Sequence, residues 1–137
     1  MYERNFASVY DRLTKDYDYE GWAAYYLSLM GSVKTLCECG CGTGSMTVAF
    51  AALVPRVTGV DISPDMLEIA AGKARAAGVF IPFVCQDMCA LTLHKPVEAV
   101  AVPCDGVNYL AEPTRVRAFF ARAFAALAPG GALVFDV

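Results

Sequence analysis

Short apolar runs and helix-like apolar spacings take turns along most of this chain. The apolar runs predict five strands, at residues 34–39, 56–60, 80–85, 98–104 and 132–137. Apolar residues that recur every three or four positions predict helices at 43–53, 64–77 and 113–127. Two more helices are expected near 3–13 and 20–30, in an aromatic-rich opening segment. Alternating strands and helices predict an α/β domain with a parallel sheet covered on both faces.

Residues at the predicted helix ends support these boundaries. Ser63 is a typical N-cap, and Pro64 suits the first helical position. Gly78 is placed to end that helix. Pro113 is placed to begin the last helix, and the Pro-Gly-Gly run at 129–131 to stop it. The helices are therefore expected to be separate from the strands that follow them.

The composition of two strands predicts their places in the sheet. Pro82 lies in the run at 80–85, and proline is tolerated mainly on edge strands. The run at 98–104 is apolar almost throughout, as in strands covered on both faces. A doubly wound, Rossmann-like sheet of order 3-2-1-4-5 satisfies both observations. The strand at 132–137 would then be the other edge, and we expect the protein to self-associate through it.

Composition and charge narrow the classes of partner. Hydrophobic residues make up 57% of the 137 residues, above the roughly 45–50% of an ordinary domain. Charged residues make up 18%, the net charge is −3, and Arg115, Arg117 and Arg122 are spaced like a solvated helix face, which argues against nucleic-acid binding. No apolar run is long enough to span a membrane, and the N-terminus does not resemble a signal peptide. A cytoplasmic location is expected.

Six cysteines raise the question of a metal site. Cys37, Cys39 and Cys41 alternate along a predicted strand and its exit turn, as small buried hydrophobes do. Cys85 and Cys89 have a spacing that suits half a zinc site, but the sequence offers no second pair. We therefore predict reduced thiols and no metal.

The strongest chemical signal is a glycine-rich turn directly after the first predicted strand. Residues 38–44 read Glu-Cys-Gly-Cys-Gly-Thr-Gly and open a helix. Glycines let the backbone turn tightly and approach a ligand closely. Ser45 stands where dinucleotide-binding turns carry their last glycine, which weakens an NAD or FAD interpretation. A glycine-rich turn without a ligand remains the alternative.

Two carboxylates follow the second and third predicted strands. Asp61 comes 21 residues after Gly40, where a carboxylate can accept hydrogen bonds from both ribose hydroxyls and would repel a 2′-phosphate. Because Ser63 already supplies the helix cap, Asp61 is free for this role. Asp87 can accept from the exocyclic amine of an adenine, and Met88 offers a soft apolar contact to its ring. The glycine turn and both aspartates are expected to line one crevice.

This series of motifs resembles that of the class I S-adenosylmethionine (SAM) dependent methyltransferases. The likeness extends from residue 34 to residue 137 and rests on E-x-G-x-G-T-G, G-V-D-I-S, Q-D-M and L-x-P-G-G-x-L-x-F-D in this order. The opening segment, with Ala-Ser-Val-Tyr-Asp at 7–11, is similar to the N-terminal lid of small bacterial members. The resemblance implies SAM as cofactor, S-adenosylhomocysteine as product and a small-molecule methyl acceptor.

The resemblance also implies roles for individual residues. Gly40, Gly42 and Gly44 would pass close to the methionine part of SAM, and Glu38 would orient this loop. Asp61 would bind the ribose hydroxyls, and Ile62 would pack on the adenine. Asp87 and Met88 would meet the adenine edge. Tyr10 would close over the cofactor, and Cys104 would stand near the sulfonium. The implied cofactor-binding set is Tyr10, Glu38, Gly40, Cys41, Gly42, Gly44, Asp61, Ile62, Asp87, Met88 and Cys104.

The sequence gives weaker signals for the residues that would contact the methyl acceptor. His94 is the only histidine and falls in a predicted loop, so Asp105 is the better candidate for a general base. Asn108 and Tyr109 either line the acceptor site or cap and pack a loop. Residues 104–110 depart from the D/N-P-P-Y motif of amino-group methyltransferases that act on nucleic-acid bases and glutamine. That substrate class becomes less favoured.

The predicted domain organisation has two parts, and three functions stay open. Residues 1–33 would form a helical lid, and residues 34–137 a SAM-binding Rossmann-like core. The family fold normally continues into two more strands, so the core is expected to be truncated, with strands six and seven missing. The first interpretation is a SAM-dependent methyltransferase. The alternatives are a nicotinamide-dependent oxidoreductase on a related fold and a non-catalytic domain that binds SAM or a protein partner.

Overall fold

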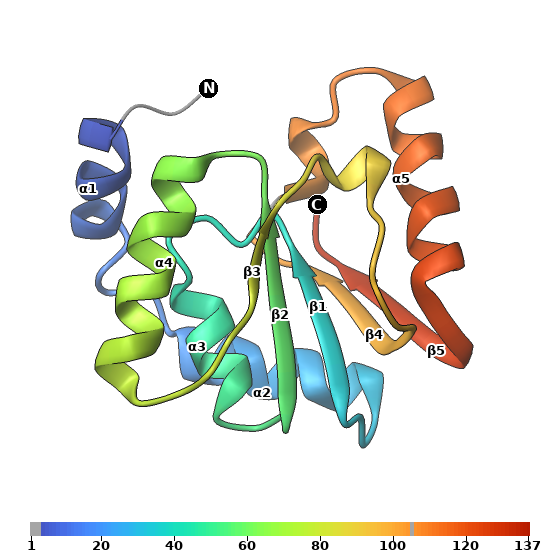
Figure 1. Cartoon of the computed structure of the whole chain (residues 1–137), viewed down its shortest axis with the longest axis horizontal. Coiled ribbons are helices and arrows are strands. Elements are labelled where there is room, and N and C mark those ends of the chain that lie inside the picture. The colour runs from blue at the N-terminus through green and yellow to red at the C-terminus, as the bar shows by residue number, and fades with distance from the viewer. Residues whose placement is uncertain (1–3, 105) are drawn as a thin grey trace.

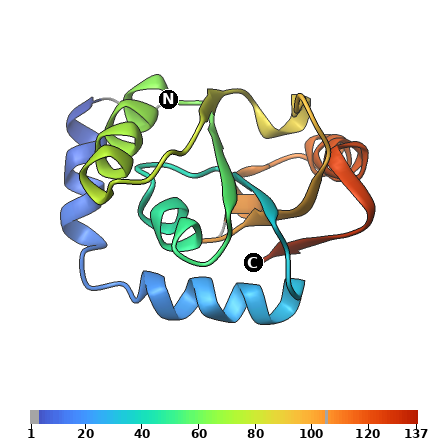
Figure 2. The same ribbon diagram turned by 60° about the horizontal axis from the view of Figure 1, so that its bottom comes forward.

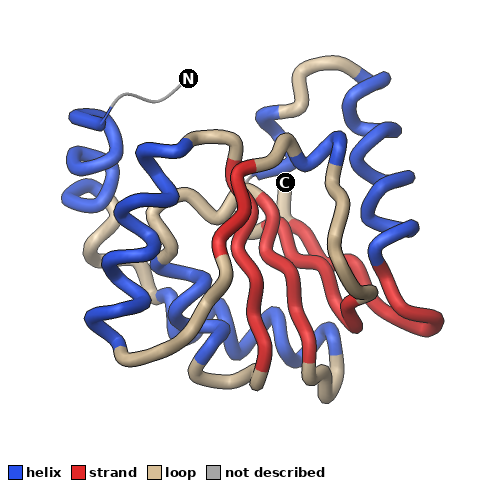
Figure 3. Tube along the Cα trace, in the orientation of Figure 1, coloured by secondary structure: helices blue, strands red, loops and turns tan. Residues whose placement is uncertain are grey.

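Five parallel strands form the centre of the structure, a computed structural model that describes residues 4–104 and 106–137 (Figure 1). Their order in the sheet is β3-β2-β1-β4-β5, as the sequence predicts. Figure 3 shows the strands side by side. Because every pairing is parallel, their carboxyl ends lie at one edge of the sheet. The strands are β1 (Thr35–Cys39), β2 (Arg56–Asp61), β3 (Phe83–Cys85), β4 (Val97–Val102) and β5 (Leu127–Phe135).

Helices cover both faces of this sheet. On one face lie α2 and α3; on the other lie α5 and the short 3₁₀ helix η1 (Figures 1 and 2). α4 packs beside α3 and against β2 and β3, and α1 lies on the outer side of α4. The helices are α1 (Arg4–Leu13), α2 (Tyr19–Met30), α3 (Ser45–Ala51), α4 (Pro64–Ala77), α5 (Pro113–Ala126), η1 (Met88–Ala90) and η2 (Gly106–Tyr109).

Strand β1 runs between two separate apolar cores. Leu36 belongs to the core under α2 and α3, where Tyr26 and Phe50 are also buried. Cys37 and Cys39 belong to the core under α5, together with buried valines of β4. Successive strand residues face opposite sides of a sheet, so the alternation in β1 fills both cores at once. The first strand is thereby held rigidly, and the turn that follows it has a fixed starting point.

The predicted ends of α4 are confirmed. The Ser63 hydroxyl accepts a hydrogen bond from the Met66 amide at 3.3 Å, as an N-cap does. Pro64 occupies the first turn, and Gly78 ends the helix in the left-handed conformation, with a φ of 70°. Among the described residues, no helix combines the length and apolar character needed to cross a membrane.

Strand β3 is shorter than the sequence predicts. It begins at Phe83, so Pro82 precedes the strand and does not lie inside it. The Pro82 carbonyl still accepts a hydrogen bond from the Gly59 amide at 3.0 Å. Pro82 has no amide hydrogen to continue the ladder, which explains why regular pairing starts one residue later. The edge position of β3 is confirmed.

The Pro-Gly-Gly run at 129–131 does not separate α5 from the last strand, contrary to the prediction. The helix ends at Ala126, and β5 begins at the next residue and contains the whole run. Its pairing with β4 shifts register between Val97 and Ala99. Gly130 has a φ of 79°, and a Cβ on Gly131 would come within 2.8 Å of the Glu98 carbonyl oxygen. The two glycines therefore permit a bulge with close backbone contact inside the strand.

Candidate functional site

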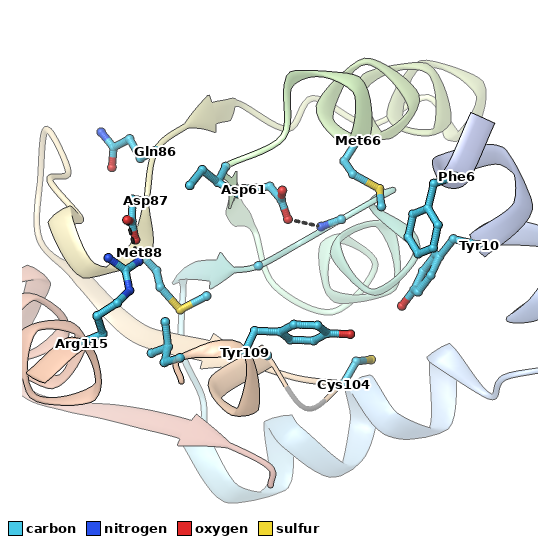
Figure 4. A pocket seen from close by; sticks show the side chains of 15 residues that line it. Phe6, Tyr10, Asp61, Met66, Gln86, Asp87, Met88, Cys104, Tyr109 and Arg115 are labelled. Carbon is cyan, nitrogen blue, oxygen red and sulfur yellow. Dashed lines mark hydrogen bonds and ion pairs between the residues drawn. The ribbon is translucent and has the colours of Figure 1, made fainter. Parts of the chain in front are cut away.

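A cavity of about 300 Å³ lies where the carboxyl ends of the strands meet (Figure 4). This volume is at the lower end of the roughly 300–1,000 Å³ of small-molecule sites. Crevices at the carboxyl ends of the strands are where open α/β sheets bind ligands. Residues from α1, the glycine turn, the end of β2, α4, η1, η2, α5 and the connecting segments line it: Phe6, Tyr10, Gly40, Gly42, Asp61, Ile62, Met66, Gln86, Asp87, Met88, Cys104, Gly106, Tyr109, Leu110 and Arg115.

The glycine turn forms one wall of this cavity. Gly40 and Gly42 line it, and both have left-handed φ values, 68° and 56°. A Cβ on Gly42 would meet no atom within 4 Å, so the space beside this backbone is open. From η1, the Met88 side chain approaches Gly40, with Cε 3.4 Å from the position of a Cβ. The turn thus offers bare backbone to a ligand on one side.

Gly44 has a different role, because it lets α3 approach α4. A Cβ on this residue would stand 2.8 Å from the Ala70 Cβ, and its φ is 86°. Gly44 does not line the cavity, and it precedes the first residue of α3. Its glycine identity is required by packing as well as by backbone conformation.

Gly44→Ala is therefore expected to lower the free energy of unfolding by about 2–4 kcal/mol, the sum of overpacking and left-handed strain. Gly78→Ala is the matched control, because Gly78 has a φ of 70° but nothing within 4 Å of its Cβ position. The control is expected to lose only about 1 kcal/mol. Urea unfolding of both variants checks this. Equal losses would show that contact with Ala70 has no effect.

Asp61 connects the glycine turn to the start of α4. Its Oδ2 accepts a hydrogen bond from the Gly42 amide at 2.9 Å (Figure 4). Its Oδ1 accepts one from the Ser63 amide, also at 2.9 Å. The residue is 8% exposed and lines the cavity. An ionised carboxylate has about four acceptor positions, so two remain available to a ligand. Asp61 can hold the turn and bind hydroxyl groups together.

Asp87 is paired with an arginine from α5. Arg115 donates from a terminal guanidinium nitrogen to Asp87 Oδ2 at 2.7 Å, and the Cys89 amide donates to Oδ1 at 2.9 Å. These contacts, with Arg115 first, lower the pKa of Asp87, although partial burial opposes the shift. The carboxylate is thus ionised at neutral pH. The ion pair ties η1 to α5 at the rim of the cavity (Figure 4).

Glu38 lies beneath the turn and does not reach the cavity. It is 2% exposed, and within the described part of the chain its Oε1 has no hydrogen-bond partner. Burial raises its pKa to about 8; the nearby Thr47 hydroxyl opposes this shift, while the negative charge of Asp61 adds to it. Glu38 is therefore mainly protonated at neutral pH. Burial also raises the pKa of Cys41, so this thiol stays neutral.

The turn after β4 is fixed by a carboxylate that follows β5. Asp136 Oδ2 accepts from the Cys104 amide at 3.0 Å and from the Tyr26 hydroxyl at 2.9 Å. Cys104 has a φ of 58° and is the one described non-glycine residue with positive φ. Burial, followed by the bond to Asp136, raises the pKa of Tyr26, so its hydroxyl remains a donor. Asp136 thus stabilises a strained backbone that presents Cys104 to the cavity.

Aromatic side chains close the opposite side of the cavity. Phe6 and Tyr10 lie one turn apart on α1, with ring centroids 6.3 Å apart. Tyr109 comes from η2 and is 71% exposed. In Figure 4 the rings of Tyr10 and Tyr109 extend toward one another above Cys104. The cavity therefore has an acidic and glycine-rich wall facing an aromatic wall.

Comparison with known proteins assigns this arrangement to a family. A family model described as a methyltransferase domain matches residues 36–131, from β1 into β5. The chain belongs to the class I SAM-dependent methyltransferase family. The glycine turn, Asp61 and Asp87 all fall inside the matched range.

Curated relatives of this methyltransferase domain extend beyond it. A Geobacillus protein whose name assigns it to the methyltransferases is 37% identical over the whole of this chain, which covers 58% of that relative. YqeM of Bacillus subtilis, also named as a methyltransferase, is 33% identical over the whole chain, which covers 56% of it. The chain thus spans somewhat more than half the length of these relatives. Neither name states an acceptor.

Solved methyltransferase structures share the fold. An S-adenosylmethionine-dependent methyltransferase from Clostridium acetobutylicum is 26% identical with a TM-score of 0.85, over 97% of this chain and 56% of that one. The SAM-bound amino pentose methyltransferase CalS10 from Micromonospora echinaspora is 28% identical with a TM-score of 0.80, over 99% and 57% of the two chains. The chain therefore shares its fold with somewhat more than half of each of these solved chains.

The structure brings most of the predicted site residues of this methyltransferase domain together. The predicted residues that line the cavity are Tyr10, Gly40, Gly42, Asp61, Ile62, Asp87, Met88, Cys104 and Tyr109. Glu38, Cys41 and Gly44 belong to the glycine turn but do not line the cavity, and Asn108 is exposed outside the cavity lining. The proposed base, Asp105, lies outside the described residues. His94 is exposed in the loop before β4.

Two contacts at the cavity are not predicted from the sequence. The spacing of Arg115 fits a solvated helix face, yet this residue pairs with Asp87 at the cavity. In the sequence Asp136 is only the last residue of a motif, yet it holds the Cys104 backbone. The motif position of Asp136, directly after a strand, was the available signal for it. No local pattern around Arg115 indicates its partner.

The six cysteines do not pair with one another. All six are free thiols, and Cys37, Cys39 and Cys41 are buried. Within residues 4–104 and 106–137, no three histidine, cysteine, aspartate or glutamate side chains are grouped so as to hold a metal ion. The spacing of Cys85 and Cys89 is accounted for by other contacts: the Cys85 thiol donates to the Ile62 carbonyl at 3.5 Å and the Cys89 thiol to the Arg115 carbonyl at 3.3 Å.

Proposed function

We propose that the cavity binds SAM and that this domain takes part in transferring its methyl group to a small-molecule acceptor. One observation supports this above the others: an acidic residue at the end of β2 holds a bare glycine turn, and both face one cavity of suitable size. The turn leaves room for a ligand beside Gly42, and Asp61 keeps free acceptor positions. Hydroxyl groups of a ribose suit those positions.

The rest of the wall fits a nucleoside with an uncharged ribose. Ile62 follows Asp61, is 61% exposed, and offers an apolar surface on which an adenine could pack. Met88 offers a polarisable contact from the other side. A 2′-phosphate would meet the charge of Asp61, and the cationic Arg115 is already paired with Asp87. These features favour SAM over NADP.

The residues of the chain would mainly position the reactants. When bound, SAM supplies a methyl group on a sulfonium, and the reaction is an in-line displacement. Asp61 and the glycine turn would fix the cofactor, while Phe6 and Tyr10 would exclude water from one side. Asp105 stays the proposed base for an acceptor that must lose a proton. Asn108 and Tyr109 stay proposed acceptor contacts.

A small-molecule acceptor is favoured over a nucleic acid. The net charge is −3, and the arginine at the cavity is neutralised by Asp87. Aromatic and apolar side chains, including Phe6, Tyr109 and Leu110, form the open side. CalS10, a structural neighbour, acts on an amino pentose, which supports an acceptor of that size. Self-association through the edge of β5 stays a prediction for measurement of the mass in solution.

Calorimetric titration with SAM, S-adenosylhomocysteine and NAD tests the proposal. We expect micromolar dissociation constants for the first two ligands and no measurable binding of NAD, because Ser45 stands where dinucleotide-binding turns carry their last glycine. Binding of NAD alone would favour an oxidoreductase. Failure of all three ligands to bind the folded chain would contradict the proposed site.

A further inference from the structure

A cluster of polar side chains joins the N-terminal helix to the glycine turn. Lys73, in the middle of α4, donates from Nζ to Asp11 Oδ1 at 2.7 Å, to Ser45 Oγ at 2.7 Å and to Thr43 Oγ1 at 3.0 Å. The Thr43 hydroxyl in turn donates to the same oxygen of Asp11. All three protons of the lysine ammonium are therefore used. We call this four-residue set the α1 latch.

The latch residues come from three different parts of the site. Asp11 belongs to α1, and Lys73 to α4. Thr43 and Ser45 flank Gly44, directly after the part of the glycine turn that lines the cavity. Asp11 follows Tyr10, whose ring lies over the cavity (Figure 4). The latch thus connects α1, which covers the cavity, with the glycine turn, which forms one wall of it.

Few of the α1 side chains that the structure describes are buried. Of the α1 side chains that the structure describes, Ala7 is the buried one, while Phe6, Val9 and Leu13 are 45%, 44% and 79% exposed. A helix of 10 residues is marginal by itself in water. Its position depends on tertiary contacts, and it packs against α4 (Figure 1). A lysine with its charge partner on this interface is therefore a strong determinant of where α1 lies.

We propose that Lys73 is a positioning residue that keeps α1 closed over the cofactor, through Asp11 and Thr43. This inference rests on the proposed function, because it assigns the cavity to a cofactor. A ligand that orders the glycine turn also orders Thr43 and Ser45, and so strengthens the latch. By reciprocity, weakening the latch weakens cofactor binding. The effect should appear mainly in the rate of cofactor release, since the lid must open for the ligand to leave.

The test compares Lys73→Met and Asp11→Asn with wild type, by hydrogen exchange of residues 4–13 and by the dissociation rate of S-adenosylhomocysteine. We expect Lys73→Met to raise both rates about tenfold, the size of one charge-assisted hydrogen bond at a partly exposed site. In the double variant, both rates should be no higher than in Lys73→Met, because the two substitutions remove the same interaction between Lys73 and Asp11. Lys73→Arg should restore part of the closure. Lys95→Met, on an exposed loop before β4, is the matched control and should change neither rate.

The outcomes separate the latch from the proposed function. Hydrogen exchange of α1 in the absence of ligand tests the latch by itself. If wild type fails to bind S-adenosylhomocysteine, that failure contradicts the proposed function alone. If wild type binds and Lys73→Met leaves both the exchange of α1 and the release rate unchanged, the latch proposal is wrong. Additive effects in the double variant would also overturn it. If Lys73→Met does not fold, Asp11→Asn decides, because it keeps the shape of the side chain.

Discussion

Asp61→Ala is expected to weaken binding of S-adenosylhomocysteine by about 100-fold or more. The carboxylate holds the Gly42 and Ser63 amides at 2.9 Å and lines the cavity. Removing it leaves two amides without their charged acceptor and removes the proposed partner of the ribose hydroxyls. Each charge-assisted hydrogen bond contributes about 1.5–3 kcal/mol. Losing the two bonds that Asp61 is proposed to accept from the ribose hydroxyls therefore accounts for an about 100-fold loss of affinity. Isothermal calorimetry on wild type and variant measures it.

A structural effect on the glycine turn must be separated from a direct contact with the ligand. The comparison uses S-adenosylhomocysteine and its 2′-deoxy analogue with both proteins. If Asp61 contacts the ribose, wild type loses affinity for the analogue, whereas Asp61→Ala shows no further loss. Asp16→Ala, an exposed aspartate between α1 and α2, serves as the control and should bind as wild type does. An affinity of Asp61→Ala within about threefold of wild type would refute the role.

The order of the sheet could be predicted because it depends on strong local signals. The apolar runs, the N-cap at Ser63 and the glycine at 78 mark the elements without reference to distant residues. The handedness and layering of α/β units then leave few arrangements. The carboxyl-end crevice follows from the same rules, which is why Gly40, Asp61 and Asp87 were expected to meet and do line one cavity.

The wrong boundaries arise where tertiary contacts override local preference. A Pro-Gly-Gly run normally ends an element, but at 129–131 the neighbouring strand β4 supplies pairing partners on both sides of the run. Gly131 then tolerates the nearby Glu98 carbonyl, which no larger residue could do without a shift. The start of β3 was misplaced for a similar reason, since one hydrogen bond to the Pro82 carbonyl extends contact without regular pairing.

The sequence does not predict which polar side chains of the site pair with one another. Arg115 and Asp87 are 28 positions apart, and Lys73 and Asp11 are 62 apart. Both basic residues lie on helices where a surface position would explain them equally well. Only the packing of α5 against η1, and of α1 against α4, brings each pair together. The motifs thus predict the residues that line the cavity. Which residues hold them in place depends on tertiary packing.

Glu38→Gln is expected to remove much of the fall in stability that wild type shows between about pH 4.5 and about pH 8. In the folded protein burial raises the pKa of Glu38 from 4.5 to about 8. Between these values the folded state binds a proton that the unfolded state has released, so stability falls as pH rises. The contribution is fully present below about pH 4.5 and is lost by about pH 8. With at most about 1.4 kcal/mol per pH unit over this range of about 3.5 pH units, the total is at most about 5 kcal/mol.

Urea unfolding of wild type and Glu38→Gln in steps from about pH 5 to about pH 9 measures this difference. The amide cannot ionise, so the variant should lack this slope, and its advantage over wild type should grow as pH rises. Asp87 does not interfere, because its lowered pKa acts only at more acidic pH. Glu20→Gln, an exposed change in the first turn of α2, should leave the slope intact. Parallel stability curves for wild type and Glu38→Gln would mean that Glu38 is ionised in the folded protein, held by a partner beneath the glycine turn.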